Sequence, residues 1–286
     1  MSSYKFRIMN VFTIPGDPFS GNPLCVFENA EGLDEKTMQA LALQFNLSET
    51  TFILPSEKAT ANVRIFTPSF EMPFAGHPTL GTAQVIGTLK SESQLTLEMK
   101  AGIIPVSGEG NRWTLRANAP VSRPVGIEKR EIAEMLGLRE EEISAPSLWV
   151  NTGSDQWIIP LATESAVDRV SVSEHLLKKH GRVNDERFLA YVWAPSGENS
   201  VKSRFFFRKG GGIAEDPATG SACANLGGWF LTVASEKLPI RKQIRQGDLT
   251  GRPSLLELFV DEESKIFVSG TVMEIGRGSV EIEPSR

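Results

Sequence analysis

The chain carries the stretch Ala75-Gly-His-Pro-Thr-Leu-Gly-Thr-Ala83, and a variant of it follows as Ala214-Glu-Asp-Pro-Ala-Thr-Gly-Ser-Ala222. The two copies are offset by 139 residues, from Pro78 to Pro217, which is close to half of the 286-residue chain. Solenoids and propellers repeat every ~20 to 50 residues, so this offset does not fit them. A duplication of half the chain instead predicts two similar domains.

Each copy leads into a segment without charge. Residues 79–89 and 217–235 contain no Asp, Glu, Lys or Arg. A helix that lacks a polar face has to be surrounded by protein, and we therefore expect each segment to form a central, buried helix. Small side chains would let a sheet approach these helices closely: Gly81, Ala83, Gly87, Gly220, Ala222, Ala224 and Gly227.

The segments before the two central helices also correspond. Each half is expected to form a strand, a surface helix and two further strands before its central helix. The surface helices are residues 34–45 and residues 172–180, the second of which Gly181 ends. The expected strands are residues 5–12, 23–28, 50–54, 63–66, 157–160, 188–193 and 203–207, and a charged helix over residues 128–136 belongs to the linker region.

These elements predict an α+β fold of two pseudo-symmetric domains, each a mostly antiparallel sheet wrapped around a central helix. The N-terminal half is expected to span residues 1–118 and the C-terminal half residues 119–271. Residues 272–286 are expected to pack back on the N-terminal half.

Composition excludes several classes of protein. The chain is 40% hydrophobic and 23% charged, which is typical of a globular protein. Its net charge of −5 provides no basic patch for a nucleic acid or an anionic membrane. The first residues carry charges where a signal peptide needs an apolar core. We therefore expect a cytoplasmic protein without a nucleic-acid or membrane partner.

Cysteine and histidine are too few for a disulfide framework or a zinc site. The chain has two cysteines, Cys25 and Cys223, and three histidines. His180 stands beside Gly181 at the end of a predicted helix, where a positive charge would complement the helix dipole. No metal is expected.

Both copies place a titratable residue directly before a proline, as His77-Pro78 and Asp216-Pro217. Proline is favoured at the first helical position, so we expect each proline to open its helix and to leave the next amides unpaired. Such amides bind a carboxylate or a phosphate at the positive end of the helix. Asp216 alone is better explained as an N-cap, but histidine is a poor cap. The duplicated position therefore favours an anion site.

Glu49 lies in the stretch Asn46-Leu-Ser-Glu-Thr50, at the start of a strand that is expected to be buried. A carboxylate is costly to bury in its charged form, and this cost suits a group that transfers protons. The alternative is a solvated turn residue. For a lone glutamate the solvated turn residue is the favoured interpretation, and the spacing of the residues does not overturn it.

Taken together, four motifs resemble the PhzF family of phenazine-biosynthesis-like proteins. They are Phe12-Thr13 with Pro18-Phe-Ser-Gly-Asn-Pro-Leu24, Asn46-Leu-Ser-Glu-Thr50, Ala75-Gly-His-Pro-Thr-Leu-Gly81 and Glu215-Asp-Pro-Ala-Thr-Gly-Ser-Ala222. The resemblance implies the diaminopimelate-epimerase-like fold, with the active site in the cleft between two pseudo-symmetric domains, and a homodimer is common in the family.

The resemblance also implies an activity, the cofactor-free isomerisation of trans-2,3-dihydro-3-hydroxyanthranilate or a similar small carboxylate by general acid/base catalysis. Glu49 would remove a proton and return it at another carbon, while His77 and Asp216 would hold polar groups of the substrate and assist the transfer. The residues expected to bind the substrate are Ser48, Gly76, Thr219, Gly220 and Ser221.

The chain departs from this pattern and from its relatives in two places. Related epimerases use a cysteine at the start of each central helix, whereas Cys223 lies inside the second helix and Cys25 lies far from the first. Residues 206–210 read Phe-Phe-Arg-Lys-Gly where the family often has Phe-x-Pro, so the substrate could differ. Two alternatives stay open, an epimerase that uses one carboxylate base and a non-catalytic binding protein on the same fold.

Overall fold

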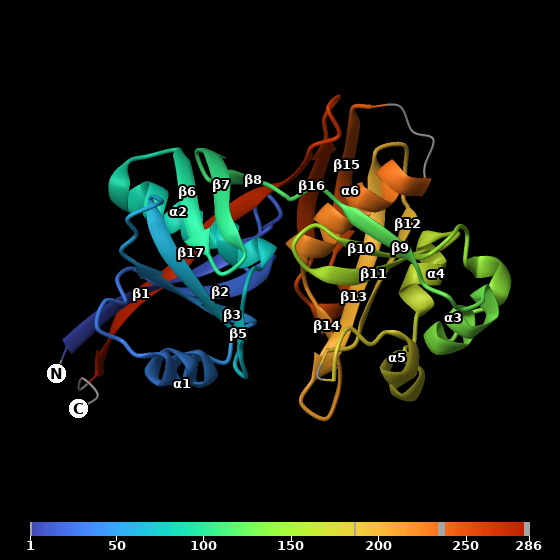
Figure 1. Ribbon diagram of the computed structural model, residues 1–286, viewed down its shortest axis with the longest axis horizontal. Helices are drawn as coiled ribbons and strands as arrows, with labels where there is room; N and C mark the ends of the chain where they lie inside the picture. Colours follow the sequence, from blue (N-terminus) through green and yellow to red (C-terminus); the bar gives the residue numbers. More distant parts are fainter. Residues whose placement is uncertain (1, 186, 234–237, 283–286) are drawn as a thin grey trace. The chain divides into compact units, whose positions relative to one another are not determined.

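The computed structural model describes residues 2–185, 187–233 and 238–282. The chain divides into two compact units. The first contains Met1–Arg116 and Ser269–Arg286, and the second contains Ala117–Val268 (Figure 1). Strand β17 (Ile266–Ile282) therefore begins in the second unit and continues into the first.

The sheet of the first unit closes on itself. Within the described residues β1 pairs with β2, β2 with β3, β3 with β4, β4 with β6, β6 with β7 and β7 with β8, and β17 joins β8 back to β1. The pairs β2–β3 and β4–β6 are parallel, and the other pairs with a described register are antiparallel. The strands are β1 (Ser2–Val11), β2 (Asn22–Phe27), β3 (Glu49–Leu54), β4 (Ala61–Phe66), β5 (Glu71–Met72), β6 (Gln94–Met99), β7 (Gly102–Glu109) and β8 (Arg112–Arg116).

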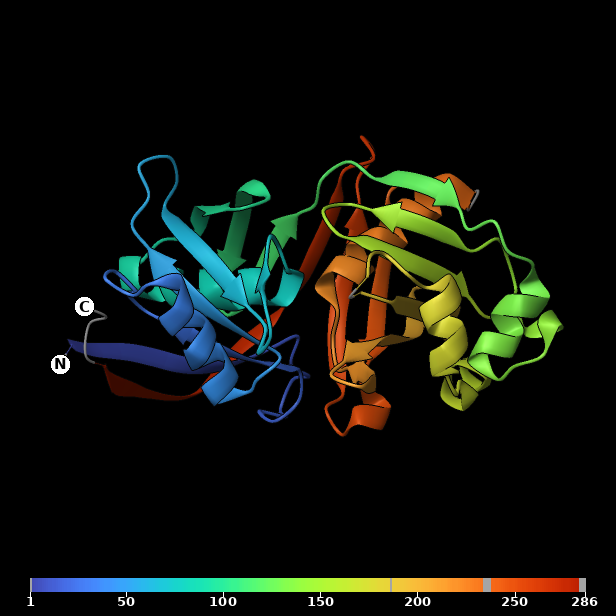
Figure 2. The ribbon, with the colours of Figure 1, turned by 60° about the horizontal axis from the view of Figure 1, so that its bottom comes forward.

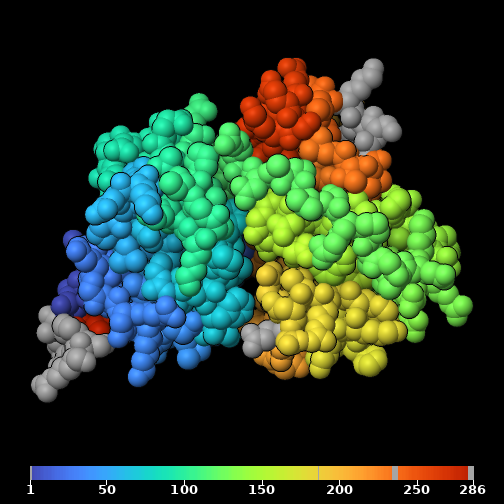
Figure 3. Space-filling model, viewed as in Figure 1, coloured from blue at the N-terminus to red at the C-terminus, as the bar shows by residue number. Residues whose placement is uncertain are grey.

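Helix α2 (Gly76–Lys90) fills this ring of strands and contacts β1, β2, β3, β6, β7 and β8. Glycines allow the close approach, because a Cβ on Gly81 would lie 2.5 Å from the Leu24 side chain. Helix α1 (Glu35–Phe45) packs outside the ring against β3 and β4, and Figure 3 shows it in blue at the surface. Its N-cap is Asp34, whose side chain accepts from the amide of Thr37.

The two ends of the described chain meet in the first unit. β17 pairs antiparallel with β1 from Val272 opposite Val11 to Ile282 opposite Ser2. Figures 1 and 2 show the two strands, red and dark blue, running side by side. Because β17 also pairs with β8, the last strand of the chain closes the ring of strands.

The second unit repeats the pairing of the first. β10 pairs with β11, β11 runs parallel to β12, β12 pairs with β13, β13 with β14 and β15 with β16, and β13 runs parallel to β15. The same sequence of pairings joins β1 to β7. The strands are β9 (Val121–Pro124), β10 (Leu148–Asn151), β11 (Asp155–Pro160), β12 (Leu189–Pro195), β13 (Ser200–Lys209), β14 (Gly212–Asp216), β15 (Ile240–Gln246) and β16 (Ser254–Val260).

Helix α6 (Gly220–Val233) is the central helix of the second unit and contacts β9, β10, β11 and β16. The last two residues of the predicted segment, 234 and 235, lie outside the described residues. The remaining helices are α3 (Lys129–Leu136), α4 (Glu164–Arg169) and α5 (Glu174–His180), with 3₁₀ turns at Glu140–Glu142 and Asp248–Thr250. The predicted α+β class, with a mostly antiparallel sheet around a central helix in each unit, is confirmed.

The predicted helix starts are wrong in position. Helix α2 begins at Gly76, because the amide of Thr79 already bonds to the Ala75 carbonyl, so Pro78 is the third helical residue. Helix α6 begins at Gly220, where the amide of Cys223 bonds to the Thr219 carbonyl. Pro217 therefore precedes the helix. Proline needs no amide partner anywhere in a first turn, so its presence marks the region of a helix start without fixing the residue.

His180 also differs from expectation. Burial removes water from its imidazolium and lowers its pKa below the ordinary 6.5, and Lys179 lowers it further, while Glu131 and Glu134 oppose the shift. The lowered pKa disfavours the positive charge that was expected to complement the helix dipole. None of the helices in the described residues is long and apolar enough to span a membrane.

The close approach at α2 predicts the effect of one added methyl group. In Gly87→Ala the new Cβ would lie 2.6 Å from the Trp113 ring and 2.8 Å from the Glu92 carbonyl. We expect the free energy of unfolding in urea to fall by about 1–3 kcal/mol. The control is Gly276→Ala in β17, where a Cβ meets nothing within 4 Å and the change should stay below about 0.5 kcal/mol. Equal effects of the two substitutions would contradict this packing.

The lowered pKa of His180 predicts a loss of stability in acid. The unfolded chain binds a proton at the ordinary pKa, whereas the folded chain binds it only at lower pH, so acidification through about pH 6.5 favours unfolding. The melting temperature of wild type should therefore fall more between about pH 7.5 and 5.5 than that of His180→Asn. The exposed His175 provides the control, because His175→Asn should keep the wild-type dependence. An unchanged pH dependence in His180→Asn would disprove the assignment.

Candidate active site

Glu49 and His77 meet in the first unit. Glu49 begins β3, and side chains alternate along a strand, so it shares a face of β3 with Thr51. The Thr51 hydroxyl lies 2.8 Å from the Thr82 hydroxyl of α2, so this face is turned toward the central helix. His77 is the second residue of α2, and its Nε2 lies 3.1 Å from Oε2 of Glu49.

Both of these atoms lack a hydrogen bond of good geometry. Nε2 of His77 and Oε2 of Glu49 are buried and have no hydrogen-bond partner in the described residues, although the two atoms are close to each other. The His77 side chain is 5% exposed and that of Glu49 is 15% exposed. An unsatisfied buried polar atom costs about 1–3 kcal/mol. Two such atoms lie side by side here, and each has capacity for a further hydrogen bond.

The start of α2 adds hydrogen-bond donors beside this pair. Gly76 and His77 occupy the first two helical positions, where an amide has no partner inside the helix, and Pro78 has no amide hydrogen. Ser48 directly precedes Glu49 and is half-buried. The first unit thus contains a carboxylate and an imidazole side by side. Beside them lie two helix-start amides, which could bind an anion.

Asp216 and Thr219 are held together in the second unit. Asp216 ends β14, and the hydroxyl of Thr219 donates to its Oδ2 over 2.5 Å. The buried Gln246 of β15 supports both residues: its Oε1 accepts from the Thr219 amide, and its Nε2 donates to the Asp216 carbonyl and the Thr219 hydroxyl. The amide and hydroxyl of Thr219 are therefore engaged in holding this loop.

Gly220 and Ser221 open helix α6 directly after this loop. The hydroxyl of Ser221 accepts a hydrogen bond of 2.8 Å from Nε2 of Gln156 on β11. Asn225, one helical turn further on, is fully buried and donates to Oε1 of the same Gln156. The second unit thus gathers Asp216, Thr219, Gly220 and Ser221 around one helix start. Whether this start and that of α2 serve one site stays a prediction.

An equivalent Arg–Glu ion pair stabilises the strands that precede each central helix. Arg64 of β4 binds both carboxylate oxygens of Glu71 on β5, and its guanidinium lies over the Phe66 ring. Arg204 of β13 likewise binds Glu215 of β14 through Nε and a terminal nitrogen. Its guanidinium lies over Phe206, and it also donates to carbonyls at the end of α4. Two-point pairs of this kind fix orientation as well as distance.

Glu215 directly precedes Asp216 in the chain, so its pairing with Arg204 fixes the strand that carries Asp216. Arg64-Ile-Phe66 and Arg204-Phe-Phe206 each stand shortly before one of the two repeated stretches, and this recurrence is a sequence signal for the pair of supports. Gln156, Asn225 and Gln246 had no such signal, because a single glutamine or asparagine on a strand or helix is not distinctive in sequence.

Potential metal ligands are dispersed in the described residues, and both cysteine thiols are buried. Among the described residues no group of three or more His, Cys, Asp or Glu side chains is placed to hold a metal ion. Cys25 and Cys223 are fully buried, and burial raises the pKa of both thiols. A thiol base has to form a thiolate, so these two cysteines are unsuited to proton transfer.

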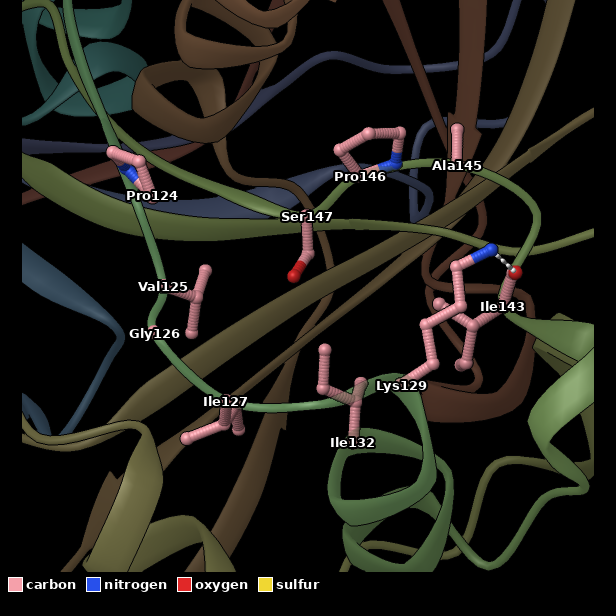
Figure 4. A pocket seen from close by; sticks show the side chains of 10 residues that line it. All are labelled: Pro124, Val125, Gly126, Ile127, Lys129, Ile132, Ile143, Ala145, Pro146 and Ser147. Carbon is pink, nitrogen blue, oxygen red and sulfur yellow. Dashed lines mark hydrogen bonds between the residues drawn. The ribbon is translucent and has the colours of Figure 1, made fainter.

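Two cavities lie away from these residues. One of about 200 Å³ in the second unit is lined by the loop after β9, by α3 and by the segment before β10. Figure 4 shows Val125, Ile132 and Ser147 pointing toward one another there, while Nζ of Lys129 donates to the Ile143 carbonyl. The other, of about 300 Å³, borders the end of α2 and Trp113. Neither is lined by an acid and a base that could exchange protons.

Comparison with known proteins gives consistent results. The family model described as phenazine biosynthesis-like protein, PhzC-PhzF, matches residues 9–277. An uncharacterized isomerase of Pasteurella multocida is 36% identical, covering 100% of this chain and 99% of that protein. The trans-2,3-dihydro-3-hydroxyanthranilate isomerase of Pseudomonas chlororaphis is 31% identical over 92% of this chain and 95% of its own. The crystal structure of a PhzF-family phenazine biosynthesis protein from Bacillus anthracis superposes with a TM-score of 0.83, at 27% identity, over 99% of this chain and 100% of that one.

The support under Asp216 can be tested by its effect on stability. Glu215→Gln keeps the shape of the side chain but leaves the largely buried Arg204 without its carboxylate. We expect the free energy of unfolding in urea to fall by about 2 kcal/mol. The control is Glu141→Gln, since Glu141 pairs with Arg139 at the exposed surface, and the expected change is below about 0.5 kcal/mol. If both variants unfold alike, the Arg204–Glu215 pair does not support the strand.

Proposed function

Because the chain belongs to the PhzC-PhzF family of phenazine biosynthesis-like proteins, we propose that it is an isomerase that shifts a proton on a small, carboxylate-bearing substrate. The observation that carries the proposal is the Glu49–His77 pair, whose facing atoms are buried, 3.1 Å apart and without hydrogen bonds of good geometry. A ligand that inserts a polar group here would satisfy both atoms at once.

In this proposal Glu49 is the base. It removes a proton from one carbon of the substrate and returns the proton at another, so the carboxylate is regenerated at the end of the cycle. The position of Glu49 as the first residue of β3, beside His77 in the first turn of α2, limits its motion. Such a fixed base needs little reorganisation to reach a bound substrate. A proton shift leaves the oxidation level of the substrate unchanged, so the proposed reaction uses no redox cofactor.

His77 and the start of α2 are proposed to stabilise the charge that develops. Loss of a proton from carbon leaves negative charge on the substrate, and an imidazole together with the amides of Gly76 and His77 provides donors for it. Asp216, Gly220 and Ser221 are proposed to hold polar groups of the substrate, including its carboxylate. Thr219 acts through the position of Asp216, since its hydroxyl is bonded to that side chain.

The first compound to test is trans-2,3-dihydro-3-hydroxyanthranilate, because relatives about 31% identical carry the name of its isomerase. The assay follows the mass of the recovered compound after incubation with the protein in D₂O. A catalyst that exchanges a carbon-bound proton with solvent raises this mass, whereas a protein that only binds leaves it unchanged. A set of other small carboxylates extends the same assay to related substrates.

The role of Glu49 gives a direct prediction. Glu49→Gln keeps the size of the side chain and removes the proton acceptor, so turnover and deuterium incorporation should fall at least ~100-fold. The melting temperature should change little, because the atom replaced has no hydrogen bond to lose in the described residues.

The matched control is Glu57→Gln, which makes the same chemical change at an exposed position. This variant should keep the wild-type rate of deuterium incorporation. Full activity in Glu49→Gln would show that Glu49 is not the base and would remove the proposed mechanism, even if the protein proved to be an isomerase.

A further inference from the structure

A chain of buried side-chain amides leads to Ser221. The backbone amide of Thr152 donates to Oδ1 of Asn225 over 2.9 Å, and the Thr152 hydroxyl donates to the same oxygen over 2.6 Å. Nδ2 of Asn225 donates to Oε1 of Gln156 and to the Ser154 carbonyl, both over 2.8 Å. Nε2 of Gln156 then donates to the Ser221 hydroxyl over 2.8 Å. Asn225 and Gln156 are 0% and 2% exposed.

The direction of this chain is fixed by the protein backbone. Oxygen and nitrogen of a side-chain amide look alike in most structures, so their assignment has to follow from the partners. A backbone N–H can only donate and a backbone carbonyl can only accept. The Thr152 amide therefore requires Oδ1 of Asn225 on its side, and the Ser154 carbonyl requires Nδ2 on the other side. Gln156 in turn has to direct Oε1 toward Asn225 and Nε2 toward Ser221.

This polarity determines what Ser221 can offer. Its oxygen accepts a hydrogen bond from Nε2 of Gln156, so its own O–H cannot point back along the same line and has to be donated to another acceptor. Ser221 is half-buried in the first turn of α6, next to amides that also only donate. The hydroxyl and these amides therefore form a group of donors, which suits an acceptor such as a carboxylate.

We propose that Gln156 and Asn225 are positioning residues that hold the Ser221 hydroxyl as a hydrogen-bond donor to a carboxylate oxygen of the ligand. This inference rests on the proposed function for the class of ligand, and it adds the two residues that set the polarity of the site. Neither residue touches the ligand. Both act through Ser221.

Gln156→Glu tests the polarity with a nearly identical shape. A carboxylate at position 156 has no proton to donate, so the Ser221 hydroxyl turns to donate to it and presents a lone pair to the ligand. Affinity for anthranilate, a stable aromatic carboxylate, should fall at least about tenfold by titration calorimetry. Part of the loss would come from repulsion between two carboxylates, so the same change is also made in Ser221→Ala.

In the Ser221→Ala background there is no hydroxyl to reverse. Adding Gln156→Glu to this variant should therefore lower its affinity for anthranilate by less than about threefold. The repulsion is present in both backgrounds and cancels in the comparison. Equal fold-changes in the two backgrounds would overturn the inference. A wild-type protein that does not bind anthranilate would overturn it as well.

A second variant is needed because a buried glutamate can prevent folding. Gln156→Met has similar volume, adds no charge and removes the donor to Ser221. It should weaken anthranilate binding by a smaller factor than Gln156→Glu, and this loss should also disappear in Ser221→Ala, while a purely structural defect would persist there. Binding is measured independently of turnover. If the protein shows this coupling but incorporates no deuterium, the inference about Ser221 stands and the proposed isomerase activity is contradicted.

Discussion

A helix without a polar face needs cover on every side, and this constraint shapes both units. In the first unit the cover is a closed ring of strands around α2, and the ring closes only because β17 returns to pair with β1 and β8. In this ring each of its eight strands has a hydrogen-bonded neighbour on both sides. Glycines at the contacts let the strands come within van der Waals distance of the helix.

Strands cover the sides of α2, and its backbone polar groups without a helical partner lie at its ends. The flanks of α2 touch strands, whereas the amides of its first turn have no helical partner and need an acceptor. Glu49 and His77 lie at this end, and the atoms they turn toward each other lack hydrogen bonds in the described residues. The cost of leaving buried groups unsatisfied is the physical reason to expect a ligand there rather than a purely structural pair.

Features that depend on local chemistry could be predicted from the sequence. The helices expected over residues 34–45 and 128–136 form as α1 and α3, and Gly137 ends α3 with a positive φ of 66°. The uncharged segments form the central helices, because a helix without a polar face has to be surrounded by protein. By contrast, β6 to β8, β15 and β16 were not predicted, although β6 and β16 alternate buried and more exposed side chains. Their pairing is set by strands far away in the chain, which local sequence does not encode. The meeting of Glu49 with His77 is likewise a long-range contact that no spacing encodes.

The side chains that position the site differ in chemistry according to what they hold. Arg64 and Arg204 fix whole strands through two-point ion pairs with Glu71 and Glu215, where strength and orientation matter. Gln156 and Gln246 fix single hydroxyls and carbonyls through neutral amides. A carboxylate in their place would change its proton count with pH and could reverse the hydrogen bonds it makes. An amide keeps its donor and its acceptor at every pH at which the protein is folded. Neutral amides therefore keep the polarity of the second helix start constant over that range of pH.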